Sequence, residues 1–273
     1  MKLEEALKIR REGRVTLFAG GTDLMVKGLR GSNLIPAIQG PVLFLSDIPD
    51  LKRWQDEGDT LFFGSCITYT DLLALPILPV LLEKAVSEIG APGIRNLATL
   101  GGNICNASPA GDSLPVLYIL NAQVRIAGGA GFRDVPISEF ILGPGTTILK
   151  QDELVAGIRI PKADLPVHYY RKVGTRKANA LSKLSCAGAA KISGEKIIDF
   201  RIAFGAVAPT VVRPREIEKK ICAMTVTECK SGYHEIVEDA LSFINPINDQ
   251  RSSSEYRRRT AGKLFQQFIT SLG

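Results

Sequence analysis

The sequence predicts an α+β protein of two domains, and three observations support this prediction. Helix-like and strand-like segments alternate over the first 160 residues. Two strand-like runs then meet at the turn "SGEK", which indicates a β-meander. The last sixty residues have helical patterns with polar breaks at "NPIND" and "SSS". The connector "KADLP" at 162–166 puts the expected domain boundary near residue 165.

The first fifty residues alternate between helix and strand. Residues 3–12 predict a charged amphipathic helix, and 15–21 predict a short strand that ends in two glycines. Thr22 is the expected N-cap of the next helix, with Leu24 and Met25 starting its apolar face. The run "VLFLSD" at 42–47 predicts a buried strand.

The next hundred residues predict further short elements. A strand begins at Leu61, and Thr70 and Asp71 start the helix after it. A second helix runs from Pro79 to Gly90, with Pro92 beyond its end. Residues 113–128 predict a helix that turns into a strand, and 152–161 predict another strand.

Composition excludes several classes of protein. The 273 residues are 45% hydrophobic and 23% charged, and no apolar run is long enough to span a bilayer. The charged N-terminus lacks the apolar core of a secretory signal, so we expect a cytoplasmic protein. The net charge of +6 is dispersed and aromatic residues are 7%, so we expect no nucleic-acid partner.

The cysteines and histidines predict no metal site. The five cysteines are odd in number and lack the two-residue spacing of zinc or redox motifs. We therefore expect neither a disulfide framework nor an iron–sulfur cluster in this chain. The two histidines, His168 and His234, lie far apart without metal-ligand spacing.

A first glycine motif, "AGGTDL" at 19–24, lies between a predicted strand and a predicted helix. Glycine lets the backbone approach a ligand and adopt positive φ, and a helix start leaves N–H groups that favour an anion. The motif is therefore either an anion site or a tight turn capped by Thr22. Asp23 would repel a phosphate, so we expect it to bond backbone N–H groups or point away.

A second glycine motif, "TLGGN" at 99–103, favours the anion site over the tight turn. Thr99 offers a hydroxyl and Asn103 an amide, both suited to phosphate or ribityl oxygens, and Asp112 could accept from a sugar hydroxyl. Two such glycine pairs, expected as turns, suit a diphosphate held from two sides. Neither is the GxGxxG fingerprint, and no GxxxxGK[ST] loop occurs, so a Rossmann or P-loop protein is disfavoured.

Four segments in order, "AGGTDL", "TLGGNICNASPAGDSLPVL", "DELVAGIRIP" and "KVGTRKANALSKL", resemble the FAD-binding subunit of molybdenum hydroxylases, the xanthine dehydrogenase and carbon monoxide dehydrogenase family. The tail from "INPIND" onward is similar as well. The resemblance covers nearly the whole chain.

The resemblance implies a two-lobed FAD-binding domain of the vanillyl-alcohol-oxidase (PCMH) type over residues 1–165, with lobes of about 1–55 and 56–165. A C-terminal domain over 166–273, with a three-stranded antiparallel sheet and helices, would close over the flavin. The FAD-contacting residues that the resemblance implies are Ala19, Gly20, Gly21, Thr22, Asp23, Leu24, Thr99, Leu100, Gly101, Gly102, Asn103, Asp112, Val155 and Lys172. Among these, Asp112 would bind a ribose or ribityl hydroxyl, and Lys172 would lie close to the isoalloxazine.

The resemblance also implies the activity. A molybdopterin-binding large subunit would oxidise the substrate, a [2Fe–2S] small subunit would relay electrons, and this chain's FAD would pass them on. We expect no general base and no covalent nucleophile in this chain, and Cys105 is expected to be a small packed thiol. Asn179 stands where eukaryotic xanthine dehydrogenases carry an acidic residue linked to NAD access, so the electron acceptor stays open.

Two other functions remain open. The chain could be a self-contained FAD oxidase, although the hundred residues after the boundary are few for a substrate-binding cap. It could also be an adaptor that kept the fold without the flavin, with the glycine pairs surviving as turns. Bound flavin and turnover without partner subunits would separate the three functions.

Overall fold

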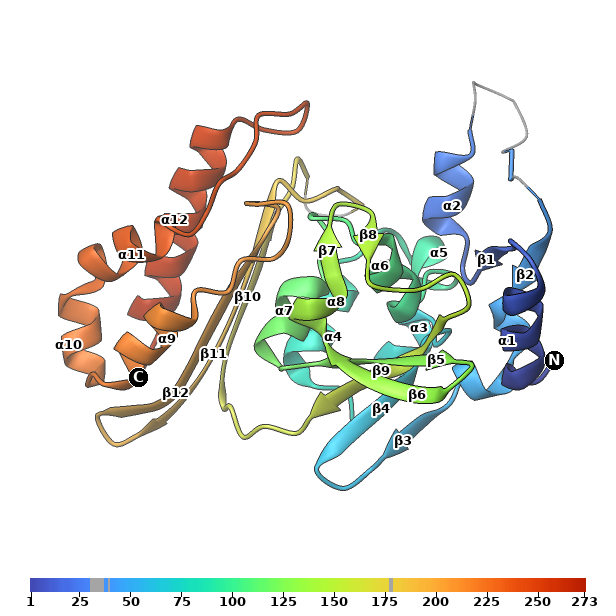
Figure 1. Ribbon diagram of the computed structural model, residues 1–273. Coiled ribbons are helices and arrows are strands. Elements are labelled where there is room, and N and C mark those ends of the chain that lie inside the picture. Colours follow the sequence, from blue (N-terminus) through green and yellow to red (C-terminus); the bar gives the residue numbers. More distant parts are fainter. Residues whose placement is uncertain (30–36, 39, 177–178) are drawn as a thin grey trace. The chain divides into compact units, whose positions relative to one another are not determined.

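The computed structural model describes residues 1–29, 37–38, 40–176 and 179–273 and confirms the predicted α+β fold (Figure 1). The chain forms two compact units that are not continuous in sequence. The first unit comprises residues 1–77, 90–107 and 121–162, and the second comprises 78–89, 108–120 and 163–273. Within the described ranges, no helix combines the length and apolar composition that crossing a membrane requires.

A five-stranded antiparallel sheet, in the order β3-β4-β9-β5-β6, is the framework of the first unit. Its strands are β3 (Trp54–Asp56), β4 (Thr60–Gly64), β5 (Gln123–Gly128), β6 (Gly131–Pro136) and β9 (Leu154–Pro161). The central strand β9 is buried over Leu154–Ile158, and its register with β5 shifts between Arg125 and Ile126. This irregularity lies opposite Val155 and Gly157.

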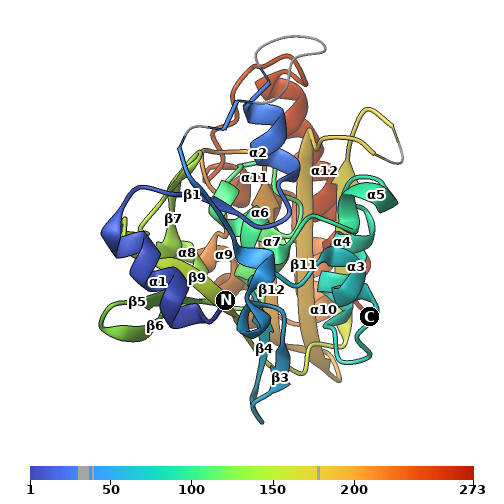
Figure 2. The same cartoon turned by 90° about the vertical axis from the view of Figure 1, so that its right-hand side faces the viewer.

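A separate parallel pair, β1 (Thr16–Phe18) and β2 (Val42–Phe44), lies beside α1 (Leu3–Glu12) in the first unit (Figure 2). Two 3₁₀ turns, Leu45–Asp47 and Pro49–Leu51, follow β2. Buried side chains from α1, β2, these turns and β9 form one apolar core. The core fixes the loop after β1, which carries the first glycine motif.

The helices of the first unit are short. They are α2 (Thr22–Lys27), α3 (Tyr69–Leu73), α5 (Pro92–Arg95), α6 (Leu100–Asn106) and α8 (Ile137–Phe140), and a small hairpin adds β7 (Ile141–Gly143) and β8 (Thr146–Thr147). Thr99 is the N-cap of α6, because its side chain accepts the N–H of Gly102 at 3.0 Å. The helix ends at Ala107, which is left-handed with φ 47°.

The second unit contains the predicted three-stranded antiparallel sheet. Its strands, in spatial order, are β10 (Val167–Val173), β11 (Leu184–Ser193) and β12 (Lys196–Gly205). The helices are α4 (Val80–Ser87), α7 (Leu114–Ile119), α9 (Arg215–Cys222), α10 (Val226–Ser231), α11 (Tyr233–Leu241) and α12 (Ser254–Thr270). In Figure 1, α9–α12 cover one face of this sheet, and α4 and α7 cover the other.

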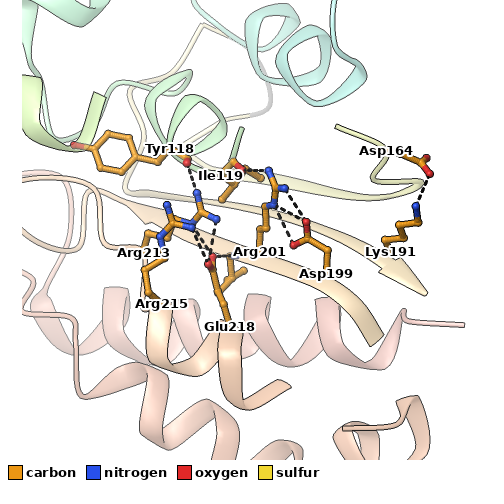
Figure 3. Close-up of polar contacts among 10 residues, drawn as sticks. Tyr118, Ile119, Asp164, Lys191, Asp199, Arg201, Arg213, Arg215 and Glu218 are labelled. Atoms are coloured by element: carbon orange, nitrogen blue, oxygen red, sulfur yellow. Dashed lines mark hydrogen bonds and ion pairs between the residues drawn. The ribbon is translucent and has the colours of Figure 1, made fainter. Parts of the chain in front are cut away.

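Arginines of the second unit cap the C-terminal end of α7 (Figure 3). Arg213 donates to the carbonyl of Tyr118, and Arg201 donates to that of Ile119 at 2.9 Å. Arg213 is also paired with Glu218 at 2.7 Å, and both side chains are buried. These cations satisfy carbonyls that a helix end leaves without partners, so they hold α7 on β12.

Two helix starts differ from the sequence prediction. Gly21, not Thr22, is the N-cap of α2, because its backbone adopts the left-handed conformation with φ 71°. Helix α2 has no buried residue, so Leu24 and Met25 do not form a core face. Helix α3 begins at Tyr69, one residue before the predicted start, and Thr68 is its cap, since Thr68 Oγ1 accepts the N–H of Asp71.

Candidate functional site

The two glycine motifs meet at one cavity of about 280 Å³ within the first unit. They are nearly 80 residues apart in the sequence, yet both belong to its wall. The lining residues are Leu17, Ala19, Gly20, Gly21, Thr22, Asp23, Leu24, Lys27, Leu45, Ser65, Cys66, Thr99, Gly101, Gly102, Asn103, Cys105, Asn106, Leu149 and Val155.

Eleven of the fourteen predicted FAD-contacting residues lie in this wall. They are Ala19, Gly20, Gly21, Thr22, Asp23, Leu24, Thr99, Gly101, Gly102, Asn103 and Val155. Leu100 does not line the cavity, because its side chain is fully buried in the core. Asp112 and Lys172 belong to the second unit and are described below.

Close packing against neighbouring segments explains why two of the glycines are required. A Cβ on Gly20 would lie 1.9 Å from the carbonyl oxygen of Leu97, and a Cβ on Gly101 would lie 2.5 Å from Cβ of Ser65. Neither backbone can move away cheaply, so these glycines let the first motif pack against the segment before α6, and α6 against Ser65. Gly21 is required for its positive φ and its contact with the Phe18 ring.

Gly102 differs from the other three glycines in the space beside it. Like Gly101, it lies in the first turn of α6 and has no positive φ, so the expected turn at the second motif is wrong. A Cβ there would meet Thr99 Oγ1 at 2.9 Å and no second atom within 4 Å. Of the four glycines, Gly102 is therefore the one that keeps open space in the cavity wall.

The N–H groups of the second motif already have partners within the chain. Gly101 donates to the carbonyl of Ser65 at 3.1 Å, Gly102 donates to Thr99 Oγ1 at 3.0 Å, and Asn103 donates to the carbonyl of Thr99 at 3.0 Å. These bonds leave the side chains of the second motif, rather than its main-chain N–H groups, to face a ligand. In the first motif, Thr22, Asp23 and Leu24 have no such N–H bond to another described residue.

Cys105 as a residue is exposed and lines the cavity, so it does not belong to the packed core. The surrounding protein nevertheless desolvates the thiol, as expected of a packed one, and this raises its pKa to about 12. Since a thiolate is the reactive form, the cavity does not activate this cysteine as a nucleophile.

Asp112 and Lys172 form a buried ion pair in the second unit, with Lys172 Nζ 2.7 Å from Asp112 Oδ2. Ser182 donates its hydroxyl to Asp112 Oδ1, and Lys172 also donates to the carbonyl of Glu88 at 2.8 Å. Burial raises the pKa of Asp112, while Lys172 and Ser182 act in the opposite direction. Asp112 and Lys172 are thus held together by contacts within the second unit.

Several site residues escaped the sequence analysis, above all Lys27, Asn106 and Ser182. Lys27 lies four residues after Asp23, and Asn106 lies three after Asn103, so helical spacing from the predicted residues could have found both. Ser182 carries no such signal.

Lys177 and Ala178, within the segment "KVGTRKANALSKL", lie outside the described residues. The main-chain carbonyl of Asn179 accepts a hydrogen bond from the side chain of Arg176.

Two family models match the chain. The FAD binding domain in molybdopterin dehydrogenase matches residues 1–163, and the CO dehydrogenase flavoprotein C-terminal domain matches residues 168–272. The chain belongs to the family of FAD-binding subunits of molybdenum hydroxylases. It is an oxidoreductase subunit whose cofactor is FAD.

Relatives with known names agree with this family. The glyceraldehyde dehydrogenase medium chain of Sulfolobus acidocaldarius is 33% identical over 94% of this chain and 90% of its own length. The xanthine dehydrogenase FAD-binding subunit of Escherichia coli O157:H7 is 32% identical over 88% of this chain and 82% of its own. A chain in the solved structure of carbon monoxide dehydrogenase from Hydrogenophaga pseudoflava superposes with a TM-score of 0.89, with 26% identity over 99% of this chain and 94% of that chain.

The cavity fits part of FAD. Gly102 leaves space at a wall where a side chain would intrude, and the first motif presents N–H groups without a described partner in the chain. Apolar side chains such as Leu17 and Val155 complete the wall. At about 280 Å³ the cavity is slightly smaller than the usual small-molecule site, which suits a segment of a dinucleotide rather than the whole molecule.

Proposed function

We propose that this chain is the electron-transfer subunit of a cytoplasmic molybdenum hydroxylase complex. In this proposal it takes electrons from the [2Fe–2S] clusters of a small subunit and delivers them to an external acceptor, while a molybdopterin-binding large subunit oxidises the substrate. When bound, FAD supplies the redox chemistry. The chain itself binds and orients the cofactor. We also propose that its FAD-binding domain covers residues 1–165 and its C-terminal domain residues 166–273.

The observation that carries the proposal is the convergence of both glycine motifs on one cavity. In the first motif, the backbone around Gly20, Gly21, Thr22 and Asp23 would contact the diphosphate through N–H groups. In the second, the side chains of Thr99 and Asn103 would contact diphosphate or ribityl oxygens, because the N–H groups of that motif are already bonded. Val155 would pack against the cofactor from β9.

We further propose that Asp112 accepts a hydrogen bond from a hydroxyl of FAD and that Lys172 lies near the flavin ring. The ion pair between them supports the first role, because Lys172 helps keep the Asp112 carboxylate ionised despite its burial. An ionised carboxylate only accepts hydrogen bonds, which is what a hydroxyl donor needs.

Reconstitution of the purified chain with FAD tests the proposal. We expect the chain to bind FAD, to show a flavin spectrum, and to have little activity toward organic substrates by itself. Robust turnover without partner subunits would instead support the self-contained oxidase. A colourless protein that takes up no added FAD would support the adaptor and overturn the proposal.

The electron route needs its own experiment. Co-expression with the molybdopterin-binding and [2Fe–2S] subunits should give a stable complex, and reduction of the flavin should then depend on the small subunit. If the large subunit alone reduces the flavin at the same rate, the proposed route is wrong while FAD binding stands.

A further inference from the structure

Two charged side chains decide the charge balance of the cavity in the first unit. Among its described lining residues, Asp23 carries the carboxylate and Lys27 the ammonium group. They stand four residues apart on α2 and therefore on one face of the helix. Any anion in this cavity meets the repulsion of Asp23 and needs a positive charge to offset it.

The hydrogen-bond partner of Lys27 is a neutral amide, so it does not neutralise the positive charge of Lys27. Lys27 Nζ lies 2.5 Å from Oδ1 of Asn106, the last residue of α6. The amide of Asn106 is neutral, and the described residues contain no ion pair between Lys27 and a carboxylate. Lys172 differs in this respect, because Asp112 already neutralises it.

We propose that Lys27 is the counter-charge for the diphosphate of FAD and that Asn106 is its positioning residue. This inference rests on the proposed FAD site. The bonded N–H groups of the second motif cannot by themselves balance the charge of a diphosphate. An ammonium group has three donors, so one bond to Asn106 leaves two for phosphate oxygens. Asn106 keeps the ammonium group at the cavity wall and away from Asp23.

The test uses the full-length chain reconstituted with FAD, with affinity measured by titration over a series of KCl concentrations. We expect Lys27→Met to weaken FAD binding about tenfold, the effect of losing one charge-assisted hydrogen bond, and to flatten the dependence on salt. Lys27→Arg should stay near the parent. Lys8→Met is the matched control, since Lys8 is an exposed lysine on α1 that pairs with Glu12.

A near-isosteric change at Asn106 tests whether the charge of Lys27, and not only the shape of the cavity wall, contributes to FAD binding. Asn106→Asp should neutralise Lys27 without removing it and should weaken FAD as Lys27→Met does. Phosphorus NMR of FAD bound at saturation should show shifted diphosphate resonances in both variants. Thermal melts of each variant without FAD establish that the fold is kept.

The outcomes distinguish this inference from the proposed function. Parent-like affinity for FAD in both Lys27→Met and Asn106→Asp would overturn the inference and leave the FAD site standing. Unchanged phosphorus resonances would also overturn it, because Lys27 would then act elsewhere than at the diphosphate. Failure of the parent chain to bind FAD would instead refute the proposed function.

Discussion

The ammonium group of Lys172 and the carboxylate of Asp112 form an ion pair at 2.7 Å, and each side chain is more than nine-tenths buried. Tyr170 adds a bond from its hydroxyl to the main-chain carbonyl of Asp112 at 3.3 Å. Alternate residues of β10 thus fix the segment that leads into α7. A buried polar cluster of this kind is stable only while each member keeps its partner.

Ser182→Ala should destabilise the second unit measurably. Ser182 is buried, and its hydroxyl is a hydrogen-bond donor to the Asp112 carboxylate. Its loss should cost about 1–3 kcal/mol in the free energy of unfolding, measured with urea. Ser185→Ala is the matched control, because Ser185 is equally buried but its hydroxyl has no partner among the described residues. Equal costs for the two variants would contradict this assignment.

Stability should fall in acid partly through Glu153. Hydrogen bonds from Arg133, and from the N–H of Lys150, hold the pKa of Glu153 below its ordinary 4.5. Folding therefore favours the ionised form, and the stability it adds is present above about pH 4.5 and is lost as the pH falls through the folded-state pKa.

Thermal melts of the parent and of Glu153→Gln between about pH 7 and pH 3 measure this contribution. We expect the parent to be the more stable at neutral pH and the difference to shrink as the pH falls. A difference that stays constant over this range would show that the carboxylate charge is not responsible.

The sequence predicted elements whose signals are local. The helix over 3–12 and the hairpin around "SGEK" follow from periodicity and turn residues within a few positions, and both are present. The predicted cap at Thr22 and the predicted helix start at Thr70 were each wrong by one residue, because a helix start depends on backbone dihedral angles that a sequence pattern does not fix.

The candidate site was predictable only in part. Glycine pairs indicate special backbone positions, but only the folded chain shows which glycines pack against backbone and which border a cavity. Ser182 has its partner 70 residues away, and no local pattern marks it. Helical spacing from Asp23 could indicate Lys27, but not that its partner is Asn106, 79 residues away. Exposure of Cys105 likewise depends on how α6 meets the rest of the first unit.

Alanine at Gly20 should reduce the stability of the fold, whereas alanine at Gly102 should reduce FAD binding. Gly20→Ala forces a methyl group against the backbone of Leu97, so we expect a loss of about 1–3 kcal/mol in unfolding free energy. Gly102→Ala should fold nearly as well as the parent but weaken FAD binding, because its methyl group displaces Thr99 Oγ1 or enters the cavity. Gly102→Val should weaken FAD binding further.

Urea unfolding and FAD titration of these variants together check the assignment. Unchanged FAD affinity in Gly102→Val would show that the second motif does not approach the cofactor. A Gly20→Ala variant as stable as the parent would show that the first motif does not pack against the backbone of Leu97 as closely as the structure has it.

Two ion pairs drawn in Figure 3 should differ sharply in their effect on stability. Arg213 and Glu218 are buried, and Glu218 also accepts the N–H of Ile202 at 2.9 Å. Arg213→Met should therefore cost about 3–5 kcal/mol, since it leaves the buried carboxylate only the more distant Arg215, at 3.4 Å, as an ion-pair partner and frees the carbonyl of Tyr118. Lys191 and Asp164 form an exposed pair at 2.8 Å, and Lys191→Met should cost about 0–1 kcal/mol, because water screens both charges. Urea unfolding of the two variants under identical salt measures the difference, and comparable losses would show that Arg213 does not hold α7 on the sheet.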